Sequence, residues 1–317
     1  MSSINTNTSA MNALSTLRQI NKDLENTQGR ISTGLSVQSG KDNAAYFSIS
    51  ETMSGDSSTY NSINEGLTLT KNSIATARLG AETIQDLAQQ FLEKVSFAQG
   101  ATGGQDEIEA DLAELVKQME TTLSQSTFNG DDMLGAGSYA GVSAGSVSAT
   151  TGALTSGINH AATTATGATV GVTRDVVTGI SRAGGAYATT EIAVDTHDVA
   201  TLVANFKTIA TSFGSNASSG SFGAAFLAGA LTATESQLSA VTDIATKLGQ
   251  SEKSIENQQD FLNKVVDNID AGVGAMIDAD MEEEAARLQA LQVQQQLATQ
   301  SLSIANSSPQ NILSLFQ

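Results

Sequence analysis

The residues that could carry chemistry are few. His160 and His197 lie in the middle of the chain without spaced cysteine or carboxylate partners, so a surface role is favoured over metal ligation. The run Glu282, Glu283 and Glu284 could hold a divalent cation, but three acidic residues at a helix start are more typical of a solvated face. The many Ser and Thr residues have no paired base and no nucleophile-elbow motif. The sequence therefore predicts no enzyme and no cofactor.

Phosphate and membrane partners are equally disfavoured. Gly103 and Gly104 lack the Lys-Ser/Thr that follows a phosphate loop, so we expect a turn between helices there. The net charge of -18 repels nucleic acid and anionic membranes. No run of about 18 apolar residues occurs, and the first residues have neither a basic nor an apolar signal region, so we expect no membrane insertion and no cleaved signal peptide.

Long amphipathic helices are the elements that the sequence does indicate. Apolar residues spaced alternately three and four apart form one seam along a helix that faces a partner helix. The first seam is interrupted by two polar residues and weakened at its end by Gly29 and Gly34. Its positions are Ala10, Leu14, Leu17, Asn21, Leu24, Gln28, Ile31 and Leu35.

A second seam runs from Ile63 to Ala98 without a break. It ends at Gly100, and a new helix follows that Asp106 could cap with Glu109 completing a capping box. The third seam is Ile108, Leu112, Leu115 and Met119, and after it Asn129-Gly130 predicts a tight turn. The large residues of the second seam are Ile63, Leu67, Ile74, Ile84, Phe91 and Val95.

Helical periodicity returns from Leu231 to Met276. The large residues of this seam are Leu238, Val241, Leu248, Ile255, Leu262 and Ile269. After Met276 the seam slips by one position, which marks either a local change of winding or a joint between two helices. It then continues through Glu284, Leu288, Leu291, Gln295, Ala298, Leu302 and Ala305, until Pro309 stops the helix before the apolar tip Ile312, Leu313, Leu315 and Phe316.

The middle of the chain, about 135–230, is rich in Ser, Thr, Gly and Ala. The stretches ATVGVTRDVVTGI and AYATTEIAV are typical of strands, and Val199, Leu202, Phe206, Ile209 and Phe213 indicate one helix. This pattern predicts a small α+β module. Its Ser and Thr residues serve either as O-glycosylation sites or as a polar surface.

The fold class that follows is mainly α, an elongated coiled-coil bundle of the N- and C-terminal segments with a small inserted α+β outer domain. We expect three parts. Residues 1–42 and 277–317 form a terminal helical pair, and residues 43–134 and 231–276 form a helical rod with a turn or short hairpin near 127–140. Residues 135–230 form a variable, surface-exposed outer domain. The terminal pair has sparse, Gln-rich seams that do not compensate the entropy of ordering it, so it should order only on assembly.

Several stretches resemble bacterial flagellins, the subunits of flagellar filaments. They are INTNTSAMNAL, RISTGLSVQSGKDNAAYFSIS from Arg30 to Ser50, STFNG from Ser126 to Gly130 and the ending ANSSPQNILSLF. The resemblance covers about 1–135 and 231–317. It implies a homo-polymer of many copies in an extracellular filament for swimming, with terminal helices in the filament core. The core residues would be Leu14, Leu17, Leu24, Ile31, Leu35, Leu288, Leu291, Leu302, Ile312, Leu313, Leu315 and Phe316.

The resemblance also implies other partners: the flagellar type III export apparatus, a filament cap and an export chaperone that binds about Leu288 to Phe316. Two alternatives stay open. A hook-filament junction protein shares flagellin-like ends, and a secreted adhesin or host-signalling ligand would use the middle as its binding module.

Flagellins sensed by a vertebrate innate immune receptor carry an Arg-rich patch on the second long helix. The corresponding stretch here has no arginine and comprises Gln89, Gln90, Phe91, Leu92, Glu93 and Lys94. We predict weak or absent recognition by that receptor. A receptor-reporter assay with purified monomer tests this, and full-strength signalling would refute it.

Hydrogen exchange on dilute monomer tests the behaviour of the ends. Because the terminal seams are sparse, we expect little amide protection in about 1–42 and 277–317 and strong protection in 63–98. Strong protection of both terminal segments in the dilute monomer would contradict the expectation.

Overall fold

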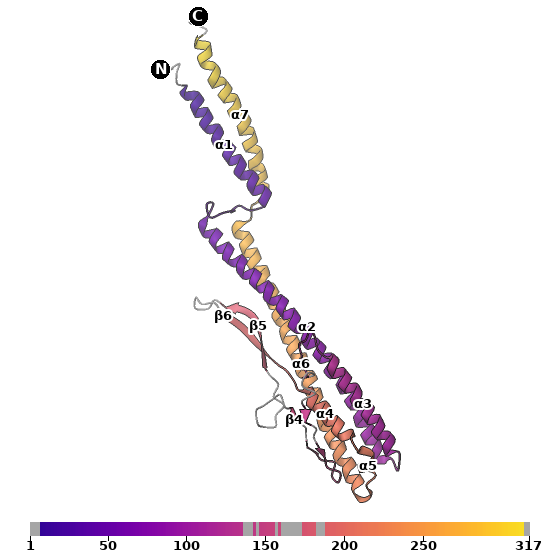
Figure 1. Cartoon of the computed structure of the whole chain (residues 1–317). Coiled ribbons are helices and arrows are strands. Elements are labelled where there is room, and N and C mark those ends of the chain that lie inside the picture. Colours follow the sequence, from indigo (N-terminus) through magenta and orange to yellow (C-terminus); the bar gives the residue numbers. More distant parts are fainter. Residues whose placement is uncertain are drawn as a thin grey trace. The chain divides into compact units, whose positions relative to one another are not determined.

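The computed structural model describes residues 7–135, 142–143, 146–155, 158–159, 173–181 and 188–313. Within these ranges the chain is dominated by long helices (Figure 1). The helices are α1 (Thr8–Thr33), α2 (Ala44–Gly100), α3 (Gln105–Gln125), α4 (Val199–Ala210), α5 (Phe213–Ala217), α6 (Gly220–Ile277) and α7 (Met281–Leu313). The strands are β1 (Val142–Ser143), β2 (Ser146–Val147), β3 (Leu154–Thr155), β4 (Ile158–Asn159), β5 (Thr173–Ser181) and β6 (Ala188–Asp195).

The strands form small antiparallel pairs inserted between helical ends. β1 pairs with β4, β2 with β3, and β5 with β6. This confirms the predicted fold class, a mainly α helical bundle of terminal segments with an inserted α+β region. His160 and part of the stretch ATVGVTRDVVTGI lie outside the described residues.

The chain divides into two compact units. One consists of Met1–Thr59 with Val265–Gln317, and the other of Tyr60–Lys264. The helices α2 and α6 each contribute to both units, so the division does not follow the three predicted sequence zones. Residues 135–230 belong to the same unit as the rod helices beside them.

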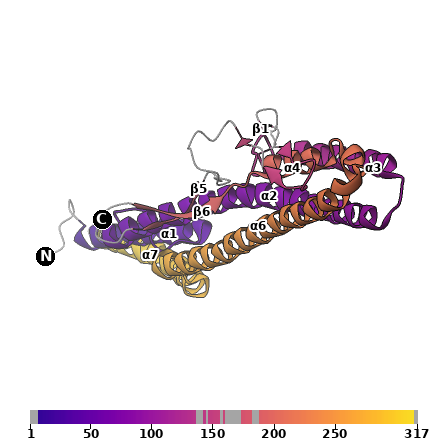
Figure 2. The same cartoon turned by 90° about the horizontal axis from the view of Figure 1, so that it is seen from below.

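The core of the unit Tyr60–Lys264 is built on the long seam of α2. All positions of that seam from Leu67 to Ala98 are buried, and Ile63 is partly buried. The ring of Phe91 packs edge-on against Phe206 of α4 with 5.2 Å between the ring centroids. The helix α4 lies beside α3, as Figure 2 shows, so the middle of the chain contributes to this core.

The buried face of α2 is broader than the single predicted seam. Ser73, Gly80 and Leu87 are buried as well, and their heptad spacing places them in a second line beside the first. Gly80 lies against Ser126 and Leu134, the residues that flank the turn after α3. The second line exists because α2 packs against that turn as well as against a partner helix.

The predicted tight turn at Asn129-Gly130 is confirmed. Both residues have positive φ, +51° and +79°, and Phe128 and Asp131 exchange two backbone hydrogen bonds across them. The Ser73 hydroxyl donates to the Asp131 carboxylate at 2.6 Å, which ties the turn to α2. Arg174 of β5 contacts the same carboxylate.

The predicted strands in the middle zone form the β5–β6 ribbon. Side chains of α2 and α6 donate hydrogen bonds to main-chain carbonyls of this ribbon. The Tyr60 hydroxyl of α2 donates to the carbonyl of Ile180 at 3.1 Å, and Gln258 Nε2 of α6 donates to the carbonyl of Thr178 at 2.9 Å. The ribbon is irregular between Val177 and Gly179, where the register shifts.

Two local predictions are wrong. Asp106 does not cap α3, because Gly104 in the left-handed conformation occupies the cap position, and the Glu109 carboxylate accepts from the backbone N–H of Gly214 instead. Phe213 does not continue α4, because Ser212 adopts φ +58° and starts the separate helix α5. The helix α6 also begins earlier than the periodicity indicated, at Gly220 rather than near Leu231.

Two glycines of α2 give a matched test of the close packing at the turn. A Cβ on Gly80 would lie 2.0 Å from Ser126 Oγ, whereas a Cβ on Gly66 would meet nothing within 4 Å. We expect Gly80→Ala to destabilise the protein by about 1–3 kcal/mol through overpacking, and Gly66→Ala to stabilise it by about 0.5–1 kcal/mol. Denaturant unfolding followed by circular dichroism measures both, and equal effects would contradict the packing described.

Candidate functional site: the paired terminal helices

The helix α1 is bounded by signals of its own sequence. The Asn7 side chain accepts a hydrogen bond from the backbone N–H of Ala10 at 3.0 Å, which satisfies a free donor of the first turn. Gly34 ends the helix with φ +74° and donates its N–H to the carbonyl of Arg30 at 2.8 Å. The helix therefore ends at the residue that readily adopts the left-handed backbone conformation, Gly34.

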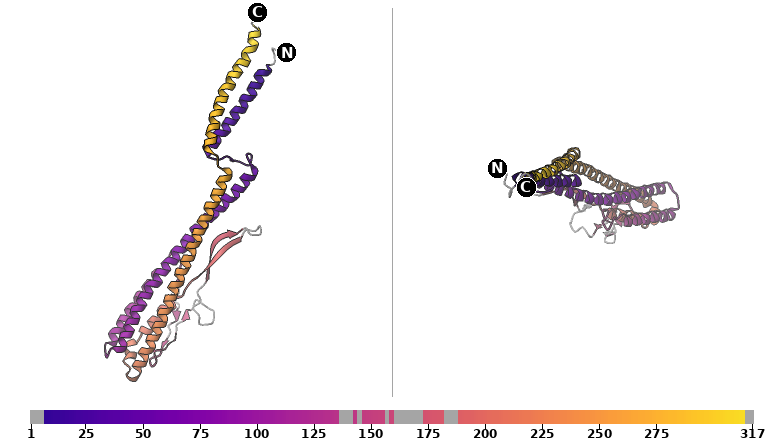
Figure 3. Two further views of the ribbon diagram at one scale, coloured as in Figure 1. Left: turned by 180° about the vertical axis from the view of Figure 1, so that it is seen from behind. Right: turned by 90° about the horizontal axis from the view of Figure 1, so that it is seen from above.

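The helices α1 and α7 lie side by side and antiparallel (Figure 3). The Asn7 side-chain amide donates to the carbonyl of Ala305 at 2.8 Å near one end of the pair. At the other end Arg30 forms an ion pair with Glu284, with 3.1 Å between Nη1 and Oε1. Between these contacts Gln295 donates to Asn21 at 2.7 Å.

The face of α1 that is covered shares only half of its positions with the predicted seam. Leu17, Leu24 and Ile31 are partly buried, and the most buried residues are Ile20 and Thr27. The intervening predicted positions Leu14, Asn21 and Gln28 are exposed instead. Each of them lies one residue after a covered residue, namely Ala13, Ile20 and Thr27, and two of those three are small or polar, so an apolar pattern alone favours the wrong neighbour.

The covered face of α7 follows the predicted seam. Leu291 is buried, and its seam neighbours Leu288 and Leu302 are partly buried. The remaining covered positions are Glu284, Gln295, Ala298 and Ala305.

A second apolar stripe runs along the other side of α7. We call it the outer stripe, and its members repeat at steps of three, four or seven and are all exposed. They are Ala286, Ala290, Val293, Leu297 and Ile304. Val293, Leu297 and Ile304 are 56%, 61% and 63% exposed. Since the stripe is offset by two residues, about 200°, from the covered seam, α7 carries apolar residues on opposite faces.

Electric charge is absent from most of α7. Residues 288–317 contain no Asp, Glu, Lys or Arg, and glutamine is the most frequent polar residue. An ordinary exposed helix face carries charged residues. A helix that is uncharged from Leu288 onward and has two apolar faces is suited to burial on both sides.

On α1 the exposed apolar residues are confined to the first turns. Met11 is 64% and Leu14 is 38% exposed, and beyond them the exposed side of the helix is polar or charged. The two helices of the pair therefore differ, since only α7 has an apolar outer face along its length.

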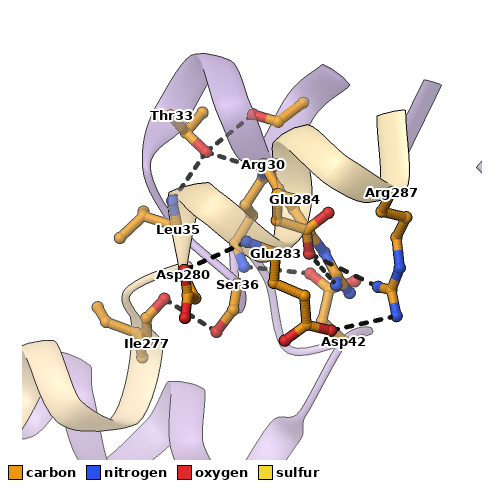
Figure 4. Close-up of polar contacts among 12 residues, drawn as sticks. Arg30, Thr33, Leu35, Ser36, Asp42, Ile277, Asp280, Glu283, Glu284 and Arg287 are labelled. Carbon is orange, nitrogen blue, oxygen red and sulfur yellow. Dashed lines mark hydrogen bonds and ion pairs between the residues drawn. The ribbon is translucent and has the colours of Figure 1, made fainter. Parts of the chain in front are cut away.

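A joint links α1, α6 and α7 (Figure 4). The backbone N–H of Ser36 donates to the carbonyl of Ile277 at 2.7 Å, and that of Ala279 donates to the carbonyl of Gly34 at 2.8 Å. The Asp280 carboxylate accepts from two N–H groups of the first turn of α7. Of the two readings of the seam slip after Met276, the joint is the one that the structure shows.

A nearby carboxylate is stabilised in its ionised form. The backbone N–H of Gln38 and the hydroxyl of Ser39 donate to Asp42 and hold its pKa below the usual value, with the charge of Arg30 acting in the same direction. Hydrogen bonds between its own residues thus stabilise the conformation of the segment between α1 and α2.

The prediction of a solvated Glu282–Glu284 face is wrong for Glu284. Glu282 and Glu283 are exposed, but Glu284 is only 5% exposed and pairs with Arg30. The seam position of Glu284 was the signal in the sequence, because a charged residue within an apolar seam requires a partner on the facing helix. The described residues contain no group of three or more His, Asp or Glu that could hold a metal ion.

The remaining predicted positions are placed as follows. Leu35 is partly buried just past α1. The prediction that Pro309 stops the helix is wrong, because α7 runs through Pro309 to Leu313, and a proline removes one backbone hydrogen bond without ending the helix here. Ile312 and Leu313 therefore belong to α7, although their side chains are not described. Leu315 and Phe316 lie outside the described residues. In the rod seams Leu67, Ile74, Ile84, Phe91, Val95, Val241, Leu248, Ile255 and Leu262 are buried, and Ile63, Leu238 and Ile269 are partly buried.

The stretch Gln89 to Lys94 lies on α2 with Phe91 pointing into the core and Leu92 partly buried. Lys94 forms an exposed ion pair with Asp111 of α3 at 2.6 Å. His197 is partly buried rather than on the surface, and burial, aided by the charge of Lys247, lowers its pKa. Among the described helices none is long and apolar enough to cross a membrane.

Comparison with known proteins agrees with this arrangement of ends. The bacterial flagellin N-terminal helical region matches residues 4–140, and the bacterial flagellin C-terminal helical region matches residues 231–316. Flagellin C of Rhizobium meliloti is 36% identical over the full length of both chains. The chain belongs to the bacterial flagellins. It is a structural subunit of the flagellar filament, an extracellular polymer that drives swimming.

Other relatives cover the middle of this flagellin as well. Flagellin of Brucella melitensis is 34% identical over the full length of both chains, and flagellin FljK of Caulobacter vibrioides is 30% identical over 100% of this chain and 99% of its own. These matches do not favour the junction-protein and adhesin alternatives.

Proposed function

We propose that α7 is the element through which copies of this flagellin contact one another in the filament core. The observation that carries the proposal is the pair of apolar faces on α7. One face is covered by α1 of the same chain, and the outer stripe of Val293, Leu297 and Ile304 is exposed. A stripe of this length and regularity is satisfied by a further helix.

The composition of α7 supports the same role. Moving charged side chains out of water is costly unless each has a partner, and residues 288–317 carry none. Glutamine amides can donate and accept hydrogen bonds between neighbouring copies without that cost. The exposed patch of Met11 and Leu14 on α1 extends the contact at the end of the pair.

The division of labour along the chain is part of the proposal. Residues 1–42 and 277–317 form the filament core, and residues 43–134 with 231–276 form the rod. Residues 135–230 form the variable outer domain, in which α4 and α5 pack on the rod. The wide buried face of α2 supports a rod that folds before assembly, since its core is complete within one chain.

The other partners are proposed from the resemblance to flagellins. We propose export of the unfolded chain through the flagellar type III apparatus without a cleaved signal peptide, insertion beneath a filament cap, and an export chaperone that covers about residues 288–316. A chaperone on that segment would shield the outer stripe before assembly. The absence of cysteine and the single proline fit rapid refolding after export. The role includes no catalytic step.

Substitutions in the outer stripe test the proposal. Burial of one such side chain contributes about 1.5 kcal/mol or more, which is about tenfold in an equilibrium constant. We expect Val293→Gln with Leu297→Gln to raise the critical concentration for polymerisation at least about tenfold. Sedimentation of seeded filaments measures it.

The matched control is Gln292→Ser with Gln296→Ser, which changes two exposed polar residues of the same helix. Its critical concentration should stay within about twofold of the parent. Equal effects of the two double variants, or unimpaired assembly of the stripe variant, would contradict the assignment of the outer stripe to contacts between copies.

A further inference from the structure

Among the described side chains of α1 and α7, Glu284 is a buried charge at their interface. Glu284 is 5% exposed, and its Oε1 lies 3.1 Å from Nη1 of Arg30. Its other oxygen, Oε2, is buried and has no hydrogen-bond partner among the described residues. Arg287, on the same helix, stands 3.6 Å from Oε1 and is half-exposed (Figure 4).

This pair is poorly suited to stabilise the interface. Removing a carboxylate from water is costly, and one unpaired oxygen leaves part of that cost uncompensated. An apolar pair of similar volume would often hold two helices as well or better. A buried ion pair mainly destabilises the alternative helix pairings in which one of the two charges is buried without its partner. It therefore contributes more to the specificity of the pairing than to its stability.

The rest of the interface specifies its register weakly. The covered residues of α1 include Ala10, Ala13 and Thr27, and those of α7 include Ala298 and Ala305. Small side chains interdigitate weakly between helices. A slip of α1 along α7 by one heptad would therefore still pack the apolar face of one helix against the apolar face of the other. The hydrogen bonds at the joint also favour the observed register, but all except that of the Ser36 hydroxyl use backbone groups, which other residues could supply in a slipped pairing.

The two heptad slips differ from the observed register in what they do to Glu284. A slip in one direction would bring Glu284 opposite Asp23, so two carboxylates would meet. A slip in the other direction would move Glu284 past the end of α1, which is at Thr33, and would set Arg30 against Leu291. The first slip therefore sets two carboxylates against each other, and the second leaves the Arg30 guanidinium against an apolar side chain.

We infer that Arg30 and Glu284 are a positioning pair that fixes the heptad register of α1 on α7. The pair selects one of several registers that the apolar seams alone would accept. The inference goes beyond the role proposed for the outer stripe and holds whatever covers that stripe.

Engineered disulfides report the register directly, because the natural chain has no cysteine. Asn21 and Gln295 are in hydrogen-bond contact across the interface, so Asn21→Cys with Gln295→Cys reports the observed register. Asn21→Cys with Leu288→Cys reports the slip that sets residue 284 against Asp23. Asn21→Cys with Leu302→Cys reports the opposite slip.

Each reporter pair is combined with Glu284→Arg, Arg30→Lys or Arg287→Leu in the full-length chain. Mild oxidation is followed by gel mobility and peptide mapping, which separate links within a chain from links between chains. Both the filament fraction and the soluble fraction are read.

Glu284→Arg opposes Arg30 in the observed register and attracts Asp23 in the slipped one. We expect the ratio of the Leu288→Cys link to the Gln295→Cys link to rise at least about tenfold. Arg30→Lys keeps the charge and should keep the observed register, and Arg287→Leu should change nothing. The inference is overturned if Glu284→Arg retains the observed register, if it loses all three links, or if Arg287→Leu alters the ratio as much.

Discussion

The constraint on which this flagellin depends is that α7 has two apolar faces and its own chain covers only one. The helix α1 packs along the face that contains Leu288, Leu291 and Leu302, and the opposite stripe remains exposed. Burying apolar surface is the main favourable term in both folding and association, so the uncovered face provides a driving force for assembly that the single chain cannot use. Because α7 carries no charged side chain from Leu288 to its end at Leu313, neighbours can surround that part of the helix without burying a charged side chain.

In the remainder of the chain, by contrast, the apolar faces of the helices are covered by other parts of the same chain. The helix α2 buries a wide face against several elements at once, and Phe91, Phe206, Phe213 and Phe226 are fully buried within one unit. That unit completes its own core and requires no second copy. The long helices α2 and α6 contribute to both units, so the unit with the complete core is continuous in sequence with the terminal helices.

The sequence predicted the helical architecture well because 4-3 periodicity is carried by large residues in α2, α6 and α7. It predicted α1 less well, because the covered residues Ala13 and Thr27 are small while the exposed Leu14 is large. The cap of α3 was predicted wrongly because Gly104 starts that helix through its left-handed backbone, without a capping side chain that a sequence pattern could indicate. The break between α4 and α5 depends on the left-handed backbone conformation of Ser212. Serine rarely adopts that conformation, so its presence in the sequence does not predict a break. The outer stripe is present in the sequence as a second helical pattern, which the prediction of a single seam on α7 left out. The pairing of Glu284 with Arg30 depends on the register between two helices far apart in the chain, which sequence patterns do not specify.

Electron cryo-microscopy of filaments reassembled from this chain tests the central claim most directly, at a resolution that shows the side chains of α7. The account predicts that Val293, Leu297 and Ile304 are buried against a neighbouring copy, while Leu291 and Leu302 remain against α1 of their own chain. A filament in which the outer stripe faces solvent, and in which copies are joined only through α2, α3 and the middle of the chain, would contradict it.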